Sequence, residues 1–547
     1  DGTALTPVPD NASADFTWTG VGTSDPTSPC TAFAGGECVV TVDSDVVGSG
    51  VLEVTGVTAT INGDTVTGDT AETLVPAEGG STSGEKTWVQ LVYDISDSAT
   101  NLIGDLHTFT ISAWYDDGSG SLTPVPEPAT ADFSWTGTGT PTTASPCTLT
   151  AGTCEVEVTS TTPGVGELTV TGVTAEIDGD PVTGDTPETL VVAEGGNESS
   201  TKTWIEVTVD VTGPAQNLTG DPHEFTLSAF IDSGSGPEPA AGAEFNYTWA
   251  GIGTADPASS CLGDANGECV VTVSSDVPGT GTLTIDTVTV TAADGTTCTD
   301  VAAVAAEGGI TETQKTWVAF DVDITPEEAL NLRTKPHTFT IQVQVDAGSG
   351  LVDLAIPPSS GEVDWEFTGP DGPDSGTCTL GAIGSCDVVQ VSDSIGDGVL
   401  TATELRVTYG GIDYTIDLTQ TGLGQAASLT IPVEANKTWG GYELVLDPLE
   451  AINLYPAQPD HTIGLQLTPE PETDLLPIDG QEIAVTLTSD VATITAVGGG
   501  GVIDAPPVTA TCITDATGFC EITITSTGPG AATLDASYLA TLGNESF

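Results

Sequence analysis

Apolar and polar residues alternate over short runs along the whole chain, as in WVQLVYDIS at 88–96, ELTVTGVTAEI at 167–177 and WIEVTVDVT at 204–212. Alternation with a period of two places every second side chain on one face of an extended strand, so each run predicts a β-strand with one buried face. Segments rich in glycine, serine and aspartate, such as DSGSG at 232–236, separate the runs and predict tight turns. The pattern favours an all-β protein.

The order of these elements repeats along the chain. A Lys-Thr-Trp tripeptide recurs at intervals of 116, 113 and 122 residues, and a histidine follows each of its lysines by 21 to 24 residues. A period of this length matches one domain with its own core. We expect domains at 1–82, 83–198, 199–311, 312–433 and 434–547, of which the first lacks its two opening strands and the last is divergent. The residues that mark the expected domain junctions are Lys86, Trp88, Lys202, Trp204, Lys315, Trp317, Lys437 and Trp439.

About seven short strands in each repeat predict an antiparallel β-sandwich, and the array is expected to be elongated. The motifs Lys-Thr-Trp, NLTGDPHEFT at 217–226 and CLGDANGECVVT at 261–272 together resemble the bacterial immunoglobulin-like repeats of large extracellular surface proteins. This resemblance covers nearly the whole chain. It implies tandem immunoglobulin-like domains, a secreted or cell-surface setting, and a role as spacer, adhesin stalk or assembly unit.

Composition narrows the classes of function. The chain has 79 acidic residues against 7 Lys and Arg, and its formal net charge is −72. Nucleic acid and anionic lipid surfaces are therefore not expected as partners. No run approaches the roughly 20 apolar residues that span a bilayer, so direct membrane insertion is not expected either. Because no known nucleophile elbow, phosphate-binding loop or HExxH motif occurs, we expect no enzyme, no catalytic residue and no organic cofactor.

The eleven cysteines form five close pairs and one single residue, Cys298. One pair in each repeat at a constant phase predicts a disulfide in every domain and an oxidising compartment. Two cysteines and one distant histidine in a repeat do not supply the four ligands of a structural zinc site. The expected disulfides join Cys30 to Cys38, Cys147 to Cys154, Cys261 to Cys269, Cys378 to Cys386, and Cys512 to Cys520.

The recurrent lysines have two interpretations. In the simpler one, each lies at a domain junction, pairs with one of the many carboxylates and is covered by its Trp. In the other, each lysine forms an amide with the asparagine that follows it by 15 or 16 residues, as some surface immunoglobulin-like domains do. Those asparagines are Asn101, Asn217, Asn331 and Asn453. The recurrent histidines are interpreted as packing residues.

Two kinds of surface site are candidates. Asp117, Asp232 and Asp346 each lie beside Gly and Ser in a turn and are weak candidates for calcium, because hard oxygen ligands suit that ion. No full EF-hand spacing is present. Sequons for glycosylation occur at Asn11, Asn197, Asn217, Asn246, Asn436 and Asn544.

The first residue of the chain corresponds to Asp117 of the next repeat. Because Asp117 follows the two opening strands of its repeat, the first repeat lacks those two strands. Either a longer array supplies those strands, or another copy of the chain supplies them by strand addition. The leading hypothesis is a non-enzymatic extracellular structural protein, a subunit or segment of a filament, sheath or surface layer. The alternative is the stalk of a large adhesin whose ligand-binding domain lies outside this segment. A third possibility is a spacer of a secreted hydrolase, which requires a catalytic domain beyond either end.

Overall fold

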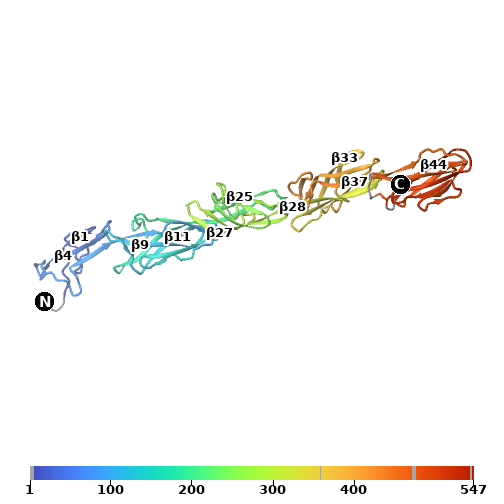
Figure 1. Cartoon of the computed structure of the whole chain (residues 1–547). Coiled ribbons are helices and arrows are strands. Elements are labelled where there is room, and N and C mark those ends of the chain that lie inside the picture. The colour runs from blue at the N-terminus through green and yellow to red at the C-terminus, as the bar shows by residue number, and fades with distance from the viewer. Residues whose placement is uncertain (1–4, 358, 471–475, 543–544, 547) are drawn as a thin grey trace.

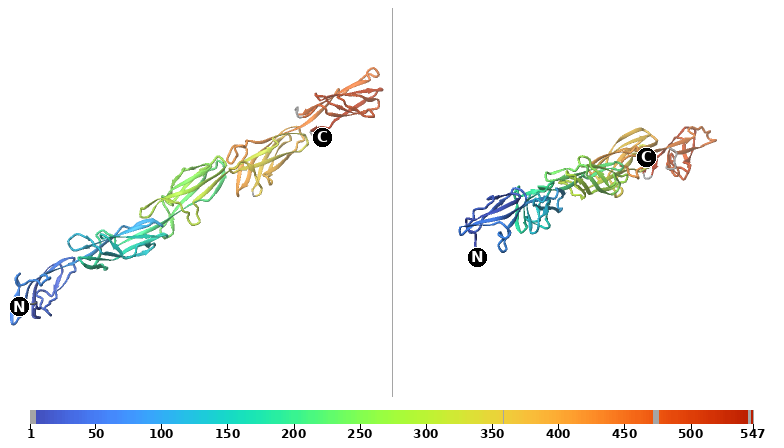
Figure 2. Two further views of the ribbon diagram at one scale, coloured as in Figure 1. Left: turned by 90° about the horizontal axis from the view of Figure 1, so that it is seen from below. Right: turned by 90° about the vertical axis from the view of Figure 1, so that its left-hand side faces the viewer.

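The structure is a computed structural model that describes residues 5–357, 359–470, 476–542 and 545–546. The chain forms an elongated rod in which five domains follow one another, and the two views of Figure 2 show that no domain folds back on another (Figures 1 and 2). All regular elements of the described residues are strands, 46 in number, and these residues contain no helix that could span a membrane.

The second domain shows the architecture of a complete unit. Two mainly antiparallel sheets pack face to face, and the sequence runs back and forth between them. The strands of the first sheet are, in order, β12 (Thr140–Pro141), β14 (Thr153–Thr159), β9 (His107–Asp116), β7 (Gln90–Ile95) and β17 (Leu190–Val192). Those of the second are β13 (Cys147–Leu149), β11 (Ala129–Gly137), β15 (Gly164–Ile177) and the first half of β18 (Ser199–Val211).

The core lies between these two sheets, and the alternation of the sequence fills it. Phe109, Ile111 and Ala113 of β9 are fully buried, and the residues between them are partly exposed. Leu168 and Val170 of β15 enter the same core from the opposite sheet. This is the sandwich that the strand pattern predicts, and burial of such side chains is its main source of stability.

Successive domains share one strand. The first half of β18, Ser199 to Trp204, pairs with β15 of the second domain. Its second half, Glu206 to Val211, pairs with β20 (His223–Asp232) of the third. The junctions at β28 (Glu312–Thr325) and β37 (Val433–Asp447) have the same arrangement. At the first junction two consecutive strands, β6 (Ser83–Trp88) and β7, pair with β4 (Gly48–Ile61) and β9 respectively.

These crossing strands begin at or within one residue of the predicted domain starts. Their first halves nevertheless complete the sheet of the preceding domain, so the change from one domain to the next falls just after each Trp. Backbone hydrogen bonds therefore hold the chain on both sides of the change, and no free linker separates the sheets.

All five expected disulfides form, and Cys298 in β27 (Thr297–Ala302) is a free thiol. The pairs do more than close a hairpin within one sheet. Cys261 lies in β24 (Ser260–Leu262) and Cys269 in β25 (Glu268–Ser274), which belong to opposite sheets of the third domain. The disulfides of the second to fifth domains thus each tie the two layers of the sandwich together at one corner.

The first domain is smaller. Its described residues form a sheet of β1 (Ser13–Gly20), β4, β5 (Asp64–Gly68) and β6, together with a short ladder of β2 (Thr23–Asp25) and β3 (Thr41–Asp43). Counterparts of β7 and β9 do not occur among these residues. Strands equivalent to β7 and β9 would pair along the edge of β3 that faces away from β2.

A substitution of Gly281 on β26 (Gly279–Thr291) tests how tightly the Trp249 indole packs at a junction. A Cβ at Gly281 would lie 2.0 Å from Cζ2 of Trp249. We expect Gly281→Ala to displace this indole and to destabilise the third domain by about 1–3 kcal/mol, measured by calorimetry of the whole chain. Gly213→Ala is the control, since no atom lies within 4 Å of the added methyl. Equal melting of the two variants would contradict this packing.

The role of the corner disulfide is tested by replacing both of its cysteines. Cys261→Ser combined with Cys269→Ser should lower the free energy of unfolding of the third domain by about 2–3 kcal/mol, because the unfolded chain loses a closed loop. Urea unfolding measures this change, with Cys298→Ser as a control that removes a thiol but no bond. A double variant as stable as the control would show that the corner is held by packing alone.

Candidate functional site

Three of the recurrent lysines are buried inside the rod. Along β18 the side chains of Ser200, Lys202 and Trp204 all point to the core of the second domain, because alternate residues share a face. Lys202 and Lys315 are 0 % exposed and Lys437 is 1 % exposed. A lysine is almost never buried to this degree without a partner.

The partner of each buried lysine is an asparagine side chain. The Nζ of Lys202 donates to Oδ1 of Asn101 at 2.6 Å, and the Nζ of Lys437 donates to Oδ1 of Asn331 at 2.9 Å. Lys315 donates in the same way to Asn217. Within the described residues, none of these three lysines forms an ion pair with a carboxylate. The ion pairs that are observed there all involve Arg406.

Two sequence-based interpretations are corrected here. The lysines do not pair with carboxylates, and each one contacts the asparagine of the preceding repeat and not the one that follows it. The reason is the strand order: Asn101 lies on β8 (Ala99–Leu102), which runs parallel to β18 and places Asn101 opposite Trp204. The same parallel register recurs between β19 (Ala215–Leu218) and β28, and between β29 (Glu328–Leu332) and β37.

Aromatic rings enclose the lysines. The Nζ atoms lie 5.9, 5.8 and 5.4 Å from the ring centroids of Trp204, Trp317 and Trp439, each of which is fully buried. Trp204 in turn meets Trp135 edge to face at 6.0 Å, and Trp317 meets Trp249 at 6.1 Å. Such cation–π contacts stabilise an ammonium that has lost its water.

Burial also changes the acid–base properties of the junction. Loss of hydration lowers the pKa of Lys202, Lys315 and Lys437 to about 8. Burial together with the charge of Lys437 lowers the pKa of His337 to about 4, so this imidazole is neutral at pH 7. The rings of His107, His223 and His337 pack edge-on against the phenylalanine two residues further along, with centroids 4.5 Å apart for His107 and Phe109. The Nε2 atoms of His107 and His337 are buried and have no hydrogen-bond partner.

A carboxylate stands beside one of the asparagines. Asn217 Nδ2 donates to Asp221 Oδ2 at 2.6 Å, and the backbone oxygen of Asp221 accepts from Nε1 of Trp317. Asp105 holds the equivalent position in the second domain, and its charge raises the pKa of Lys202 against the larger effect of burial. At the last junction, at β37, Lys335 holds this position, and its backbone oxygen accepts from Nε1 of Trp439.

The lysine of the first repeat and the asparagine of the last repeat do not form such a buried pair. Lys86 is exposed on β6, and Trp88 is half-buried against Trp18, with the ring centroids 5.8 Å apart. Asn453 is exposed and its Nδ2 donates to the backbone oxygen of Asp460. The buried pair therefore forms at three junctions of the described chain.

The predicted calcium ligands lie apart from this cluster. Oδ1 of Asp232 accepts from the backbone of Gly234 and Gly236 within its own turn, and Asp346 is arranged in the same way. Asp117 accepts from the backbone of Ser119. The described residues contain no group of three or more His, Cys, Asp or Glu side chains that could hold a metal ion.

The sequons lie in different environments. Asn11 and Asn436 are exposed. The side-chain amides of Asn197, Asn217 and Asn246 donate hydrogen bonds to neighbouring oxygens. Asn544 lies outside the described residues.

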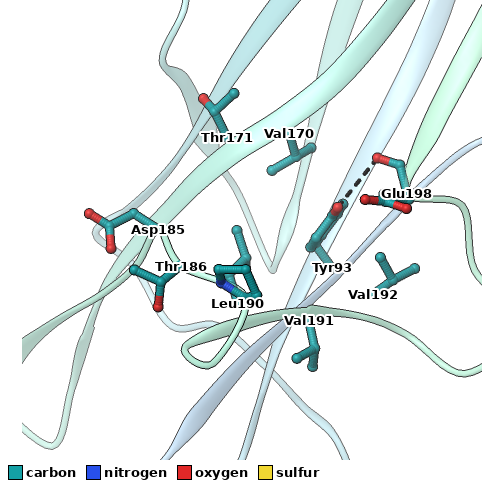
Figure 3. Close-up of a pocket in the computed structure, with 10 residues that line it drawn as sticks. Tyr93, Val170, Thr171, Asp185, Thr186, Leu190, Val191, Val192 and Glu198 are labelled. Carbon is teal, nitrogen blue, oxygen red and sulfur yellow. Dashed lines mark hydrogen bonds between the residues drawn. The ribbon is translucent and has the colours of Figure 1, made fainter.

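A groove of about 390 Å³ opens between the 185–192 segment and the sheets of the second domain (Figure 3). Tyr93, whose hydroxyl donates to the backbone oxygen of Glu198 at 3.3 Å, lines it together with Leu190 and Val192. Its two carboxylate side chains, Asp185 and Glu198, lie on opposite sides of the groove and do not converge on a common point (Figure 3). The groove therefore has no arrangement that would specify a ligand.

Sequence reasoning missed the glycines that face the lysines. Gly166, Gly281 and Gly398 pair directly with Lys202, Lys315 and Lys437 across the ladder. A side chain at Gly166 or Gly281 would overlap Trp135 or Trp249. Each glycine ends a Gly-x-Gly tripeptide that recurs in phase with Lys-Thr-Trp, so a comparison of the repeats could have found it.

Comparison with known proteins finds only remote structural similarity. No protein-family model and no curated protein matches the chain. Among solved structures, three N-terminal domains of the Highly Immunogenic Outer Capsid protein of bacteriophage RB49 are 15% identical, with 64% of this chain and 98% of that chain covered and a TM-score of 0.26. A tetra-tandem repeat from the extending region of a large adhesion protein is 15% identical (83% and 96% covered, TM-score 0.24), and invasin, a bacterial integrin-binding protein, is 12% identical (82% and 79%, TM-score 0.25).

These identities and TM-scores are low, so the class of protein rests on the sheets themselves. The chain is a tandem array of immunoglobulin-like β-sandwich domains. The resemblance to the tandem immunoglobulin-like repeats of bacterial surface proteins is confirmed for the fold, and function requires separate evidence.

The buried lysine of the last junction predicts a pH dependence. Lys437 has a pKa of about 8 in the folded chain, and lysine titrates near about 10.4 when unfolded. Between these values the unfolded chain binds more protons, so the free energy of unfolding contributed by this site rises with pH. Lys437→Met should flatten the rise by at most about 1.4 kcal/mol per pH unit, measured by urea unfolding from pH 8 to 10.

Lys86→Met is the matched control for this measurement, because it removes an exposed lysine of the same motif. An unchanged pH slope in Lys437→Met would mean that the amine at this junction is hydrated.

Proposed function

We propose that the chain is a non-enzymatic extracellular structural protein, a load-bearing segment of a filament, sheath or surface layer. The observation that carries the proposal is the shared strand at each junction. A pull along the rod passes from one sheet into the next through a continuous strand that is hydrogen-bonded in both domains. The strand has no flexible linker in which the load could first extend the chain.

Side-chain contacts across the junctions support a stiff rod. The Oγ of Thr100 in the second domain donates to Asp294 in a hairpin of the third at 2.6 Å. Gln216 in the third domain donates to the hydroxyl of Tyr414 in the fourth at 3.0 Å. Each hairpin reaches back from the following domain, so bending at the junction would break these hydrogen bonds.

The setting of the protein follows from its covalent chemistry and charge. Five disulfides suggest an oxidising compartment, and we propose secretion or display at the cell surface. Other copies of the chain or neighbouring repeats are the proposed partners, with strand addition at the open first domain as the route.

The alternative function is the stalk of a large adhesin. The stiff, elongated shape of the rod also suits this function, because a stalk must hold a distant domain away from the surface. The two differ in assembly: a filament subunit forms ordered contacts between copies, and a stalk remains a separate rod.

Electron microscopy of the isolated chain tests the rod. We expect straight particles, and we expect that two glycines inserted between Trp204 and Ile205 introduce one bend at the junction of the second and third domains. The same insertion after Gly179 is the control and should leave the rod straight. Gly179 lies in a hairpin, and no atom would lie within 4 Å of a Cβ added there. Bends at several junctions of the unmodified chain would contradict a load-bearing rod. Ordered lateral or end-to-end contacts at high concentration would favour the filament over the stalk.

A further inference from the structure

The geometry points to covalent amide bonds between Lys202 and Asn101 and between Lys315 and Asn217, each formed within the protein with release of ammonia, whereas Lys437 and Asn331 stay unlinked. The inference concerns the chemistry of the junctions and does not depend on the proposed function.

The first support is the placement of the reacting groups. In both pairs the lysine nitrogen already touches the carboxamide, at 2.6 Å between Nζ and Oδ1 for Lys202 and Asn101. The parallel ladders of β8 with β18 and of β19 with β28 fix the two backbones at the same register. Groups held together in this way react as if at a very high local concentration.

The second support is the exclusion of water. Lys202 and Lys315 have no exposed surface, and buried Trp rings cover their amines. An amine without its hydration shell is more readily neutral, and the neutral amine is the nucleophile. The low pKa of both lysines agrees with this, since burial lowers it to about 8.

The reaction balances without an added reagent. The neutral Nζ attacks Cγ of the asparagine and forms a new N–C bond, and the carbonyl oxygen carries the negative charge of the tetrahedral intermediate. A proton moves from Nζ to the amide nitrogen, the C–N bond to that nitrogen breaks, and ammonia leaves. One amine and one carboxamide thus give one secondary amide and one ammonia.

Asp221 is placed to move this proton. Its Oδ2 lies 2.6 Å from Nδ2 of Asn217, which is the nitrogen that leaves. A carboxyl group at that position can take the proton from the attacking amine and deliver it to the leaving group. Asp105 follows Asn101 by four residues, as Asp221 follows Asn217, and its charge raises the pKa of Lys202.

The last junction, at β37, is an internal control. The backbone oxygens of Asp221 and Lys335 accept the same hydrogen bond, from Nε1 of Trp317 and of Trp439, so the two residues are structurally equivalent. At this junction Nδ2 of Asn331 donates to the backbone oxygen of Pro336 and not to a carboxylate. The lysine and the asparagine are in contact there, but the proton carrier is replaced by a second lysine.

The bonds would lie where a pulling force enters and leaves a domain. Asn101 follows the entry strand β7, and Lys202 lies on the exit strand β18, 101 residues further along. A covalent bond between them would carry the load past the sandwich, so the residues between them would not be extended by force.

Intact mass of the whole chain, produced in the oxidising periplasm of a host that does not glycosylate, tests the proposal. We expect a mass lower by two ammonia molecules than that of the chain with five disulfides. Peptide mapping should give branched peptides that join Lys202 to Asn101 and Lys315 to Asn217, with a linear peptide at Lys437. A chain at the full mass would overturn the proposal.

Two variants test the role of the acid. Asp221→Asn should lose one ammonia instead of two, and Lys335→Asp should gain a third cross-link at Lys437. Asp264→Asn, in an exposed turn, is the control and should lose two. Circular dichroism of each variant shows that the sheets are retained. Loss of both ammonia molecules in a folded Asp221→Asn chain would overturn the assignment of Asp221 as the proton carrier.

Discussion

The burial of a lysine ammonium beneath a Trp ring, on a strand that two domains share, is the constraint on which the rest of the rod depends. To bury Lys437 the chain must supply a polar partner, an aromatic cover and a glycine opposite it, and it does so with Asn331, Trp439 and Gly398. An unpaired buried charge would cost several kcal/mol, so these residues belong together. Their common phase along the sequence follows from this requirement.

The same arrangement explains why domains are joined without linkers. The lysine and its Trp complete the core of one sandwich, and the residues that follow them open the next. Trp204 belongs to the core of the second domain, and Ile205, its neighbour in the chain, belongs to the core of the third. The junction is therefore part of both hydrophobic cores, and a large change in the angle between domains would disturb each of them.

Much of the fold could be predicted from the sequence, because strand alternation and the repeat period are local or periodic signals. The cysteine pairs were predictable for the same reason, since only seven or eight residues separate their members. The partner of each lysine was not predictable in this way. Asn101 and Lys202 lie in successive repeats, and only the parallel register of β8 on β18 brings them together. Spacing alone favoured the nearer Asn217, which contacts Lys315 of the next repeat.

The rod depends on β18 being one uninterrupted strand that two sheets share. Hydrogen exchange of the backbone amides of β18, followed by mass spectrometry on the intact chain, tests this continuity. We expect slow exchange over the whole of Ser199–Val211, including Trp204 and Ile205. Fast exchange confined to Trp204, Ile205 and Glu206, with protection on either side, would show a flexible linker and would contradict it.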